Sequence, residues 1–493
     1  MRRWASFAVL VVIVATAALF IRVIVVARDF DTVVAADRFE SMRDDPTALR
    51  AFLARMPKGG DLHVHLSGAV YAERLIAWAV QDRLCVRLTD LSIVDPPCDR
   101  NAGTAPITDT LADQALYDRI VNALSMRFFR PMSAAASGHD QFFATFNRFG
   151  RASGHSVDMT VDMLRRYQAE NVLYAEFMMT FLPGSVRVEL ANAIKGQTDY
   201  ASMLATLKAR GLDKVVDAMR TQIAEQIKGI DAALDCDPQR TKPGCAVDYR
   251  YIAQVSRNTP IEEVFVQTAA AAALVRAEPW VVALNFVQVE DAQIARRDYS
   301  PHMRIVQFLA NDIPVALHAG ELWIGLVPPD DLTFHITSAV TIAGARRIGH
   351  GTALAFEKGM DGLLATMRRR DVAVEISLTS SDLILGVRGK EHPLSTYLAA
   401  GVPVVLSTDD AGVSRIDLTN EYVRAAYEHG LGYRKLKAIA RNGLTYSFIR
   451  EEKKRDLLAR LDRASEEFEQ ALVGQRGTLR SLAALIRAAV WPL

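Results

Sequence analysis

The sequence has no excess of charge of either sign and very little cysteine. Its 493 residues include 58 Lys and Arg against 57 Asp and Glu, which leaves a formal net charge of +1. Such a chain has no overall field to attract a polyanion, so nucleic acid is not expected as a partner. The sequence also lacks internal repeats and low-complexity tracts. Half of the residues are hydrophobic and 23% are charged, which excludes a disordered chain and predicts one large globular domain with appendages.

The four cysteines form two pairs that are close in the sequence: Cys85 with Cys98, and Cys236 with Cys245. Each pair encloses a segment with proline, which is typical of a loop. Metal binding by these cysteines is disfavoured, because no C-x-x-C motif or paired histidine accompanies them. The spacing predicts two local disulfides formed in an oxidising compartment, with four unrelated thiols as the alternative.

Residues 1–27 have the pattern of a signal peptide or membrane anchor. Arg2 and Arg3 precede an apolar run over residues 5–27. A small-x-small motif at residues 15–17 offers a cleavage site, whereas the uncleaved run is long enough to span a bilayer. In either case the rest of the chain is expected to be exported: periplasmic, extracellular, or anchored and facing outward. A buried N-terminal helix is the alternative. No membrane contact is predicted apart from this segment.

Eight short β-rich runs alternate with stretches long enough for helices, which favours a parallel sheet. The runs are residues 61–66, 172–177, 249–255, 281–287, 314–317, 345–348, 372–376 and 404–406. Eight such units predict an α/β fold of the (β/α)8 TIM-barrel type.

Other segments are expected to flank or interrupt this barrel. Residues 28–60 predict an N-terminal helical arm that ends at a proline and two glycines. The barrel is expected over residues 61–475, with an insertion at 82–140 that contains the first cysteine pair. A C-terminal helix is expected over residues 476–493. Its apolar part, from residue 479, is expected to pack on the barrel, with membrane binding as the alternative.

Two histidines lie two positions apart in the first predicted strand, at His63 and His65. Alternate residues of a strand point to the same face, so both imidazoles can reach one metal ion. Alone, this pair is also compatible with two ordinary polar histidines near a strand end.

More polar residues follow the ends of later predicted strands. They are His318 and Glu321 after the fifth strand, His350 after the sixth, and Asp409 and Asp410 after the eighth. The carboxyl ends of the strands form the face on which barrel enzymes assemble their sites. Three neutral imidazoles and one carboxylate fit zinc with an open position for water, which is typical of a catalytic site.

This ordered set of motifs resembles the adenosine and AMP deaminase family. The matching segments are Met56-Pro57-Lys58-Gly59, His63-Val64-His65, His318-Ala319-Gly320-Glu321, Gly349-His350-Gly351, Ser377-Leu378-Thr379-Ser380-Ser381 and Ser407-Thr408-Asp409-Asp410. The resemblance extends over residues 56–422. It is closest to the secreted adenosine deaminases related to growth factors, which also carry an export signal and a disulfide-bearing insertion after the first strand. It implies a small purine nucleoside as the substrate, and a homodimer formed through the arm or the insertion.

The resemblance also implies a role for each motif residue. One zinc ion per chain would be held by His63, His65, His318 and Asp409. The zinc would lower the pKa of a bound water. Glu321 would protonate N1 of the purine, His350 would orient or deprotonate the attacking water, and Asp410 would contact the N7 side of the base. The implied reaction converts adenosine or 2′-deoxyadenosine to inosine and ammonia.

Two positions depart from the family pattern, and both concern substrate binding. Ser67 stands where relatives usually have a carboxylate that accepts a hydrogen bond from the ribose 5′-hydroxyl, and a serine forms a weaker bond. Gln288 stands where relatives usually have a glycine whose backbone N–H holds N3 of the purine. These departures leave a 5′-modified adenosine or another aminated heterocycle open as the substrate.

Two other classes of protein are compatible with parts of the pattern. A different metal-dependent barrel amidohydrolase would share the H-x-H strand and the late aspartate, but its binuclear site needs a bridging Lys or Glu on the fourth strand. Residues 281–289 contain neither, although Glu290 follows directly. A non-catalytic secreted nucleoside-binding protein would be expected to lack a metal ligand or Glu321, and all of these residues are present.

Overall fold

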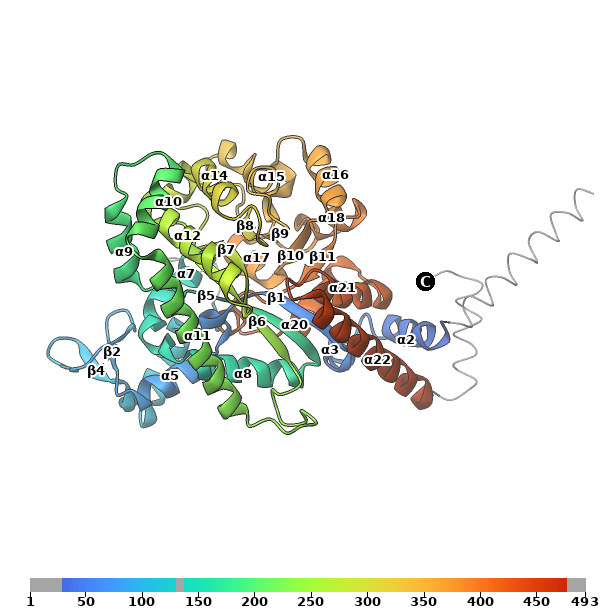
Figure 1. Ribbon diagram of the computed structural model, residues 1–493. Helices are drawn as coiled ribbons and strands as arrows, with labels where there is room; N and C mark the ends of the chain where they lie inside the picture. The colour runs from blue at the N-terminus through green and yellow to red at the C-terminus, as the bar shows by residue number, and fades with distance from the viewer. Residues whose placement is uncertain (1–28, 130–136, 477–493) are drawn as a thin grey trace, which may run out of the picture.

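The computed structural model describes residues 29–129 and 137–476 of the chain (Figure 1). The predicted export segment and the apolar C-terminal stretch from residue 479 lie outside these ranges. Within the described ranges, no helix is both long and apolar enough to cross a membrane.

Eight parallel strands form two sheets of four. The first sheet has the order β1-β5-β6-β7, with β1 (Lys58–His65), β5 (Val172–Met179), β6 (Asp248–Ser256) and β7 (Val281–Val287). The second has the order β11-β10-β9-β8, with β8 (Ala316–Ala319), β9 (Arg347–His350), β10 (Ala373–Ile376) and β11 (Val404–Leu406). The eight predicted strands and the parallel α/β class are confirmed. The prediction for β8 began too early, because Pro314 has no N–H with which to join a ladder.

The two sheets contact each other at both of their edges. A bridge pairs Leu284 with Val315 between β7 and β8, and another pairs Val64 with Asp409 between β1 and the residues after β11. At the second junction, the Asp409 N–H donates to the His63 carbonyl at 2.9 Å. Residues far apart in the sequence are therefore brought to one end of the strands.

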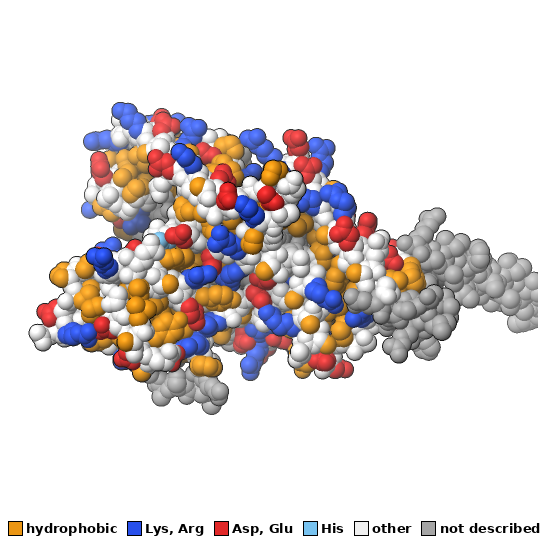
Figure 2. All heavy atoms as spheres, turned by 90° about the horizontal axis from the view of Figure 1, so that it is seen from below, with side chains coloured by type: hydrophobic (Ala, Val, Ile, Leu, Met, Phe, Trp, Pro, Cys, Tyr) orange, Lys and Arg blue, Asp and Glu red, His pale blue; other side chains and the backbone are white. Residues whose placement is uncertain are grey.

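Helices occupy most of the chain between the strands. They are α2 (Phe30–Glu40), α3 (Pro46–Arg55), α4 (Leu66–Ala69), α5 (Ala72–Gln81), α6 (Gln114–Ala123), α7 (Gly138–Phe149), α8 (Ser156–Ala169), α9 (Gly184–Ala193), α10 (Tyr200–Ala209), α11 (Leu212–Leu234), α12 (Ile261–Ala277), α13 (Gln293–Arg297), α14 (Tyr299–Leu309), α15 (His335–Thr341), α16 (Met360–Arg370), α17 (Leu378–Leu385), α18 (Leu394–Ala399), α19 (Ala411–Ser414), α20 (Leu418–His429), α21 (Tyr433–Thr445) and α22 (Glu451–Arg476). Many of them surround the strands in Figure 1. Lys and Arg side chains alternate with Asp and Glu over the face seen in Figure 2, in keeping with the small net charge.

The N-terminal helices α2 and α3 pack against the C-terminal helices α21 and α22. The ring of Phe52 lies 5.8 Å from Tyr433 and 5.2 Å from Phe468, and Phe39 lies 6.4 Å from Tyr433. The two ends of the described chain are therefore joined by an aromatic cluster.

A small antiparallel sheet lies between β1 and β5 in the sequence. It has the order β3-β2-β4, with β2 (Cys85–Arg87), β3 (Ile93–Val94) and β4 (Thr104–Pro106). A disulfide joins Cys85 to Cys98, and a second joins Cys236 to Cys245 after α11. Both predicted cysteine pairs are confirmed.

Loss of the first disulfide is expected to destabilise the small sheet. The bond closes a loop across a sequence separation of 13 residues. A disulfide that closes a loop of this size is expected to stabilise the fold by about 3 kcal/mol, because it restricts the conformations of the unfolded chain. Limited proteolysis and thermal unfolding of a Cys85→Ser, Cys98→Ser variant measure the loss. Equal protease resistance and equal thermal stability of the variant and the unchanged protein would contradict the prediction.

Candidate metal centre and substrate pocket

Three imidazoles converge at the carboxyl ends of the strands. His63 and His65 come from β1 and His318 from β8, and the Nε2 atoms of His63 and His65 each lie 3.1 Å from Nε2 of His318. Asp409 completes the group, with Oδ1 at 3.5 Å from His63 Nε2 and 3.4 Å from His65 Nε2. The structure thus brings together all four residues that the sequence predicts as metal ligands.

The spacing of these atoms fits a tetrahedral metal ion. Zinc is bound at about 2.0–2.2 Å by His and Asp, so ligand atoms at the corners of a tetrahedron lie roughly 3.4 Å apart. The four separations of 3.1, 3.1, 3.5 and 3.4 Å agree with this value. Two imidazole nitrogens at 3.1 Å also repel each other unless a proton or a cation lies between them. The residues present therefore fit a metal ion.

A buried carboxylate orients His63. Glu375 lies in β10, and its Oε2 is 2.6 Å from His63 Nδ1, which directs His63 Nε2 toward the other ligands. Arg347 of β9 stabilises the charge of Glu375, with Nε at 2.5 Å from Oε1. Neither residue was predicted from the sequence. A glutamate within an apolar strand was the available signal, because such a residue is seldom buried without a partner.

The other ligands have polar partners as well. Asn285 Oδ1 lies 2.8 Å from His318 Nδ1, and Ser380 Oγ donates to Asp409 Oδ2 at 2.7 Å. These contacts leave His318 Nε2 and Asp409 Oδ1 for the metal. No role for Asn285 or Ser380 was predicted from the sequence.

Gln254 of β6 is the polar partner that orients His65. Its Nε2 lies 2.8 Å from His65 Nδ1, and its Oε1 accepts a hydrogen bond from Thr180 at 3.0 Å. A His65 that binds metal through Nε2 carries its proton on Nδ1 and needs an acceptor there. Turning the Gln254 amide by about 180° supplies that acceptor and keeps the Thr180 contact, because a hydroxyl both donates and accepts.

The electrostatics of the four ligands favour a bound cation. Burial lowers the pKa of His65 to about 3 and that of His318 well below its usual value, so both are neutral. Burial also opposes a charge on His63, but Asp409 and Glu375 raise its pKa to about 10. The pKa of Asp409 stays well below normal despite burial, because of His63 and the neighbouring imidazoles. A divalent cation can therefore replace the proton on His63.

Three further predicted residues lie beside these ligands. The His350 ring is 4.8 Å from the His63 ring, and its Nε2 lies 3.7 Å from Glu321 Oε1. Burial and the charge of Asp409 raise the pKa of Glu321 well above its usual value, and burial and Asp409 do the same for Asp410. Burial lowers the pKa of His350 to about 4. The site thus contains a carboxyl whose protonated form is favoured by burial, beside a neutral imidazole.

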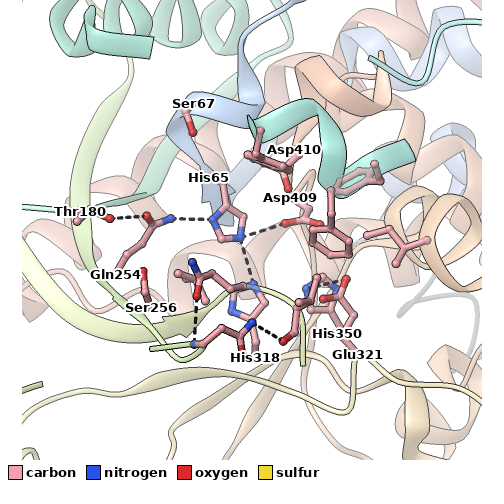
Figure 3. Close-up of a pocket in the computed structure, with 18 of the residues that line it drawn as sticks. His65, Ser67, Thr180, Gln254, Ser256, His318, Glu321, His350, Asp409 and Asp410 are labelled. Atoms are coloured by element: carbon pink, nitrogen blue, oxygen red, sulfur yellow. Dashed lines mark hydrogen bonds and ion pairs between the residues drawn. The ribbon is translucent and has the colours of Figure 1, made fainter. Parts of the chain in front are cut away.

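A cavity of about 430 Å³ opens at this group of residues (Figure 3). Glu321, His350, Asp409 and Asp410 contribute to its wall. Three phenylalanines of α7 also line it: Phe142, Phe143 and Phe146. No role for these three phenylalanines was predicted from the sequence. The cavity has the size of a small-molecule site, and its wall combines these aromatic rings with many polar side chains.

The two residues that depart from the family pattern also line the cavity. Ser67 follows β1, and Gln288 follows β7. Gln288 has a φ of +79°, the left-handed conformation that favours glycine. Its Oε1 accepts a hydrogen bond from the Asn258 N–H at 3.1 Å, so the side chain is held at the rim. The glycine-like backbone is retained although the residue is not glycine.

The strain at Gln288 predicts an order of stability between two variants. Gln288→Gly and Gln288→Ala both lose the hydrogen bond to Asn258. Only the alanine variant still has the conformational cost, about 1 kcal/mol, of an L-residue in the left-handed region. We expect the glycine variant to have the higher free energy of unfolding in denaturant titrations. Gln222, exposed within α11, is the matched control. There the alanine variant should have the higher free energy of unfolding, by about 1 kcal/mol, because glycine disfavours a helix. Equal stability of the two Gln288 variants would contradict the prediction.

A parallel α/β fold with a His and Asp cluster at its strand ends defines a metal-binding protein of the α/β class. The family model for adenosine deaminase matches residues 204–464, more than half of the chain. The chain belongs to the adenosine deaminase family.

Two curated relatives show how far the sequence similarity extends. An adenosine deaminase of Enterococcus faecalis is 33% identical over 171 residues, which are 34% of this chain and 47% of that protein. An aminodeoxyfutalosine deaminase of Streptomyces coelicolor is 34% identical over 164 residues, 32% of this chain and 37% of that protein. The chain thus spans about half or less of the length of these relatives.

Solved structures share the fold over a longer range. The N6-methyl-AMP deaminase of Arabidopsis thaliana matches with a TM-score of 0.55 and 20% identity, over 85% of this chain and 99% of that one. A Burkholderia ambifaria amidohydrolase with bound zinc matches with a TM-score of 0.52 and 18% identity, over 86% of this chain and 94% of that one. At this identity the likeness concerns the fold.

Proposed function

We propose that this protein is a zinc-dependent aminohydrolase that converts adenosine or 2′-deoxyadenosine to inosine-type products and ammonia. One observation carries the proposal. Four ligand atoms lie at spacings that fit a tetrahedron, and three of the residues that bear them, His65, His318 and Asp409, line one cavity. Glu321 lines the same cavity and lies 3.7 Å from His350. The site thus combines a metal centre with an acid and a base, as hydrolytic deamination requires.

We further propose that the two sheets form a single (β/α)8 barrel. The bridges Leu284–Val315 and Val64–Asp409 support this, because they join the sheets at both edges. The site then lies at the carboxyl ends of the barrel strands.

In this proposal zinc, held by His63, His65, His318 and Asp409, supplies Lewis-acid polarisation of a water molecule. His350 accepts a proton from the attacking water, because its imidazole is buried and neutral. Glu321 donates its proton to N1 of the purine, which makes C6 more electrophilic. Asp410 contacts the N7 side of the base. The amino group then leaves as ammonia.

The groups that bind the rest of the substrate suggest a second candidate substrate. In our proposal Ser67 contacts the ribose and the Gln288 backbone contacts the base. Ser67 offers the 5′ position a neutral hydroxyl, and the Gln288 side chain narrows the rim. A 5′-modified adenosine or another aminated heterocycle is therefore the alternative substrate. The names of the Streptomyces and Arabidopsis proteins above refer to aminated purine compounds of this wider kind.

We also propose that the protein is exported, through the segment at residues 1–27. The two disulfides support this, because such bonds persist in oxidising compartments.

Loss of the adenosine absorbance band by the purified, zinc-loaded protein tests the function. Rapid loss, with one ammonia released per adenosine, supports the proposal. No loss with adenosine or 2′-deoxyadenosine, in protein with one zinc per chain, would overturn these substrates. Ammonia release from 5′-substituted adenosines would then decide for the alternative.

A further inference from the structure

We propose that Glu290 is a positioning residue that holds Glu321 in place for proton transfer. The inference rests on the function proposed above for Glu321. Glu290 follows β7 and is 1% exposed, and it does not line the cavity that the described residues form around the metal centre. A buried carboxylate beside an active site and outside its cavity needs another explanation.

The carboxylate of Glu290 binds the backbone from which the Glu321 side chain projects. Its Oε1 accepts a hydrogen bond from the Gly320 N–H at 3.1 Å, and its Oε2 accepts one from the Glu321 N–H at 2.8 Å. Two consecutive amides on one carboxylate fix the orientation of the peptide between them. The Glu321 Oε1 atom lies 3.7 Å from His350 Nε2, which is too far for a hydrogen bond. The position of Glu321 therefore depends on its backbone.

The same carboxylate holds the other end of this loop. His335, the first residue of α15, places Nδ1 at 2.6 Å from Glu290 Oε1. The His335 ring stacks on Tyr299, with centroids 3.7 Å apart, and the Tyr299 hydroxyl donates to the His335 carbonyl at 2.9 Å. One carboxylate thus ties together both ends of the segment 320–335.

Buried neighbours favour the charged form of Glu290. Burial opposes its ionisation, but His335, Arg257 and the Gly320 amide hold the pKa of Glu290 below its usual value. Arg257 Nη1 lies 3.8 Å from Glu290 Oε1, and its Nη2 donates to the His318 carbonyl at 3.2 Å. The ion pair therefore also contacts the backbone of β8, which contains the ligand His318 and ends two residues before Glu321.

The segment that Glu290 closes has a small core of its own. Leu322, Val327 and Leu332 pack together under Ala353. A rigid segment of this kind transmits the position of its anchor to Glu321, whereas a loose loop would not.

The test is the variant Glu290→Gln in the full, zinc-loaded protein. The amide has nearly the same size, but its NH2 group cannot accept a hydrogen bond from a backbone N–H or from His335. We expect kcat for adenosine to fall by about 10- to 100-fold, because small displacements of a reacting group are costly. KM should change much less, and one zinc per chain should remain. Glu290→Asp, which keeps the charge, should recover part of kcat and serves if the Gln variant does not fold.

Glu357→Gln is the matched control. Glu357 is also buried and also holds α15, since its carboxylate accepts from the Ile336 N–H at 2.6 Å and from Thr337 Oγ1 at 2.6 Å. It has no bond to Gly320 or Glu321. A kcat close to that of the unchanged protein is expected. An equal loss of kcat in both variants would overturn the proposal, because general loosening of α15 would then explain it.

Two further measurements separate positioning from other roles. If Glu290 acts through Glu321, the double variant Glu290→Gln, Glu321→Gln should be no slower than Glu321→Gln alone. A double variant whose loss of kcat is the product of the two single losses would contradict this. Independently of activity, amide hydrogen exchange at residues 320 and 321 should be at least about 10-fold faster in Glu290→Gln, and unchanged in Glu357→Gln. Slow exchange in Glu290→Gln would overturn the anchoring even if the protein deaminates adenosine. Fast exchange in a protein that deaminates nothing would refute the proposed function and leave the anchoring standing.

Discussion

Replacing Asp409 by Asn is expected to remove bound zinc and, with it, the deamination of adenosine. Asp409 is the single anionic ligand among the four, and its Oδ1 lies 3.5 and 3.4 Å from the Nε2 atoms of His63 and His65. Changes to residues that merely orient a ligand weaken metal binding by about 10- to 100-fold, and loss of a ligand should exceed this. Metal analysis after gel filtration should give one zinc per unchanged chain and much less in the variant. Activity should fall below detection.

The matched control is Asp213→Asn, an exposed aspartate in the first turn of α11. It should keep both zinc and activity. Full zinc content in Asp409→Asn would contradict the assignment of Asp409 as a ligand. Zinc should also raise the melting temperature of the unchanged protein and not of the variant, because a ligand stabilises the state that binds it.

The second large effect is expected for Glu321→Gln. An amide retains the shape of the side chain but has no acidic proton to transfer to the purine. General acid catalysis contributes about 10²- to 10⁴-fold, and we expect kcat to fall by that factor with zinc content unchanged. Glu391→Gln, at an exposed position, is the control and should be fully active. A kcat within a few-fold of normal in Glu321→Gln would exclude Glu321 as the proton donor.

The pH dependence follows from the same residue. Burial and the charge of Asp409 raise the pKa of Glu321, so its protonated form persists at pH values where an ordinary glutamate is ionised. Because the protonated form is the active one, kcat should stay constant in this range and fall as the pH rises through the raised pKa. The residual activity of Glu321→Gln should lack this fall. An identical fall in both proteins would assign it to another group.

The strand pattern was readable in the sequence because each buried strand is a short apolar run between turn residues. All eight strands were found in this way, and the alternation of His63 and His65 placed both side chains on one face. The two cysteine pairs were readable as well, since both disulfides are local. The apolar ends at residues 1–27 and 479–493 stay predictions.

Several residues that hold the site residues in place could not be recognised from the sequence. Gln254 and Asn285 look like ordinary polar residues of their strands, and Glu290 seemed relevant only as an argument about a second metal. Their partners, His65, His318 and the Glu321 backbone, lie on other strands or loops. Only the packed structure shows these pairs.

The sequence by itself determined the class of fold, which follows from local periodicity, and it predicted polar residues gathered where the ends of parallel strands meet. Which of these residues are metal ligands was predicted from the resemblance to the family. The tertiary structure alone decided which partner orients each ligand, which helix lines the cavity and what holds Glu321. The reason is physical, because such contacts depend on the register between strands and on side-chain rotamers. A contact between distant segments does not change the hydrophobic periodicity of either segment, so it cannot be recognised in the sequence.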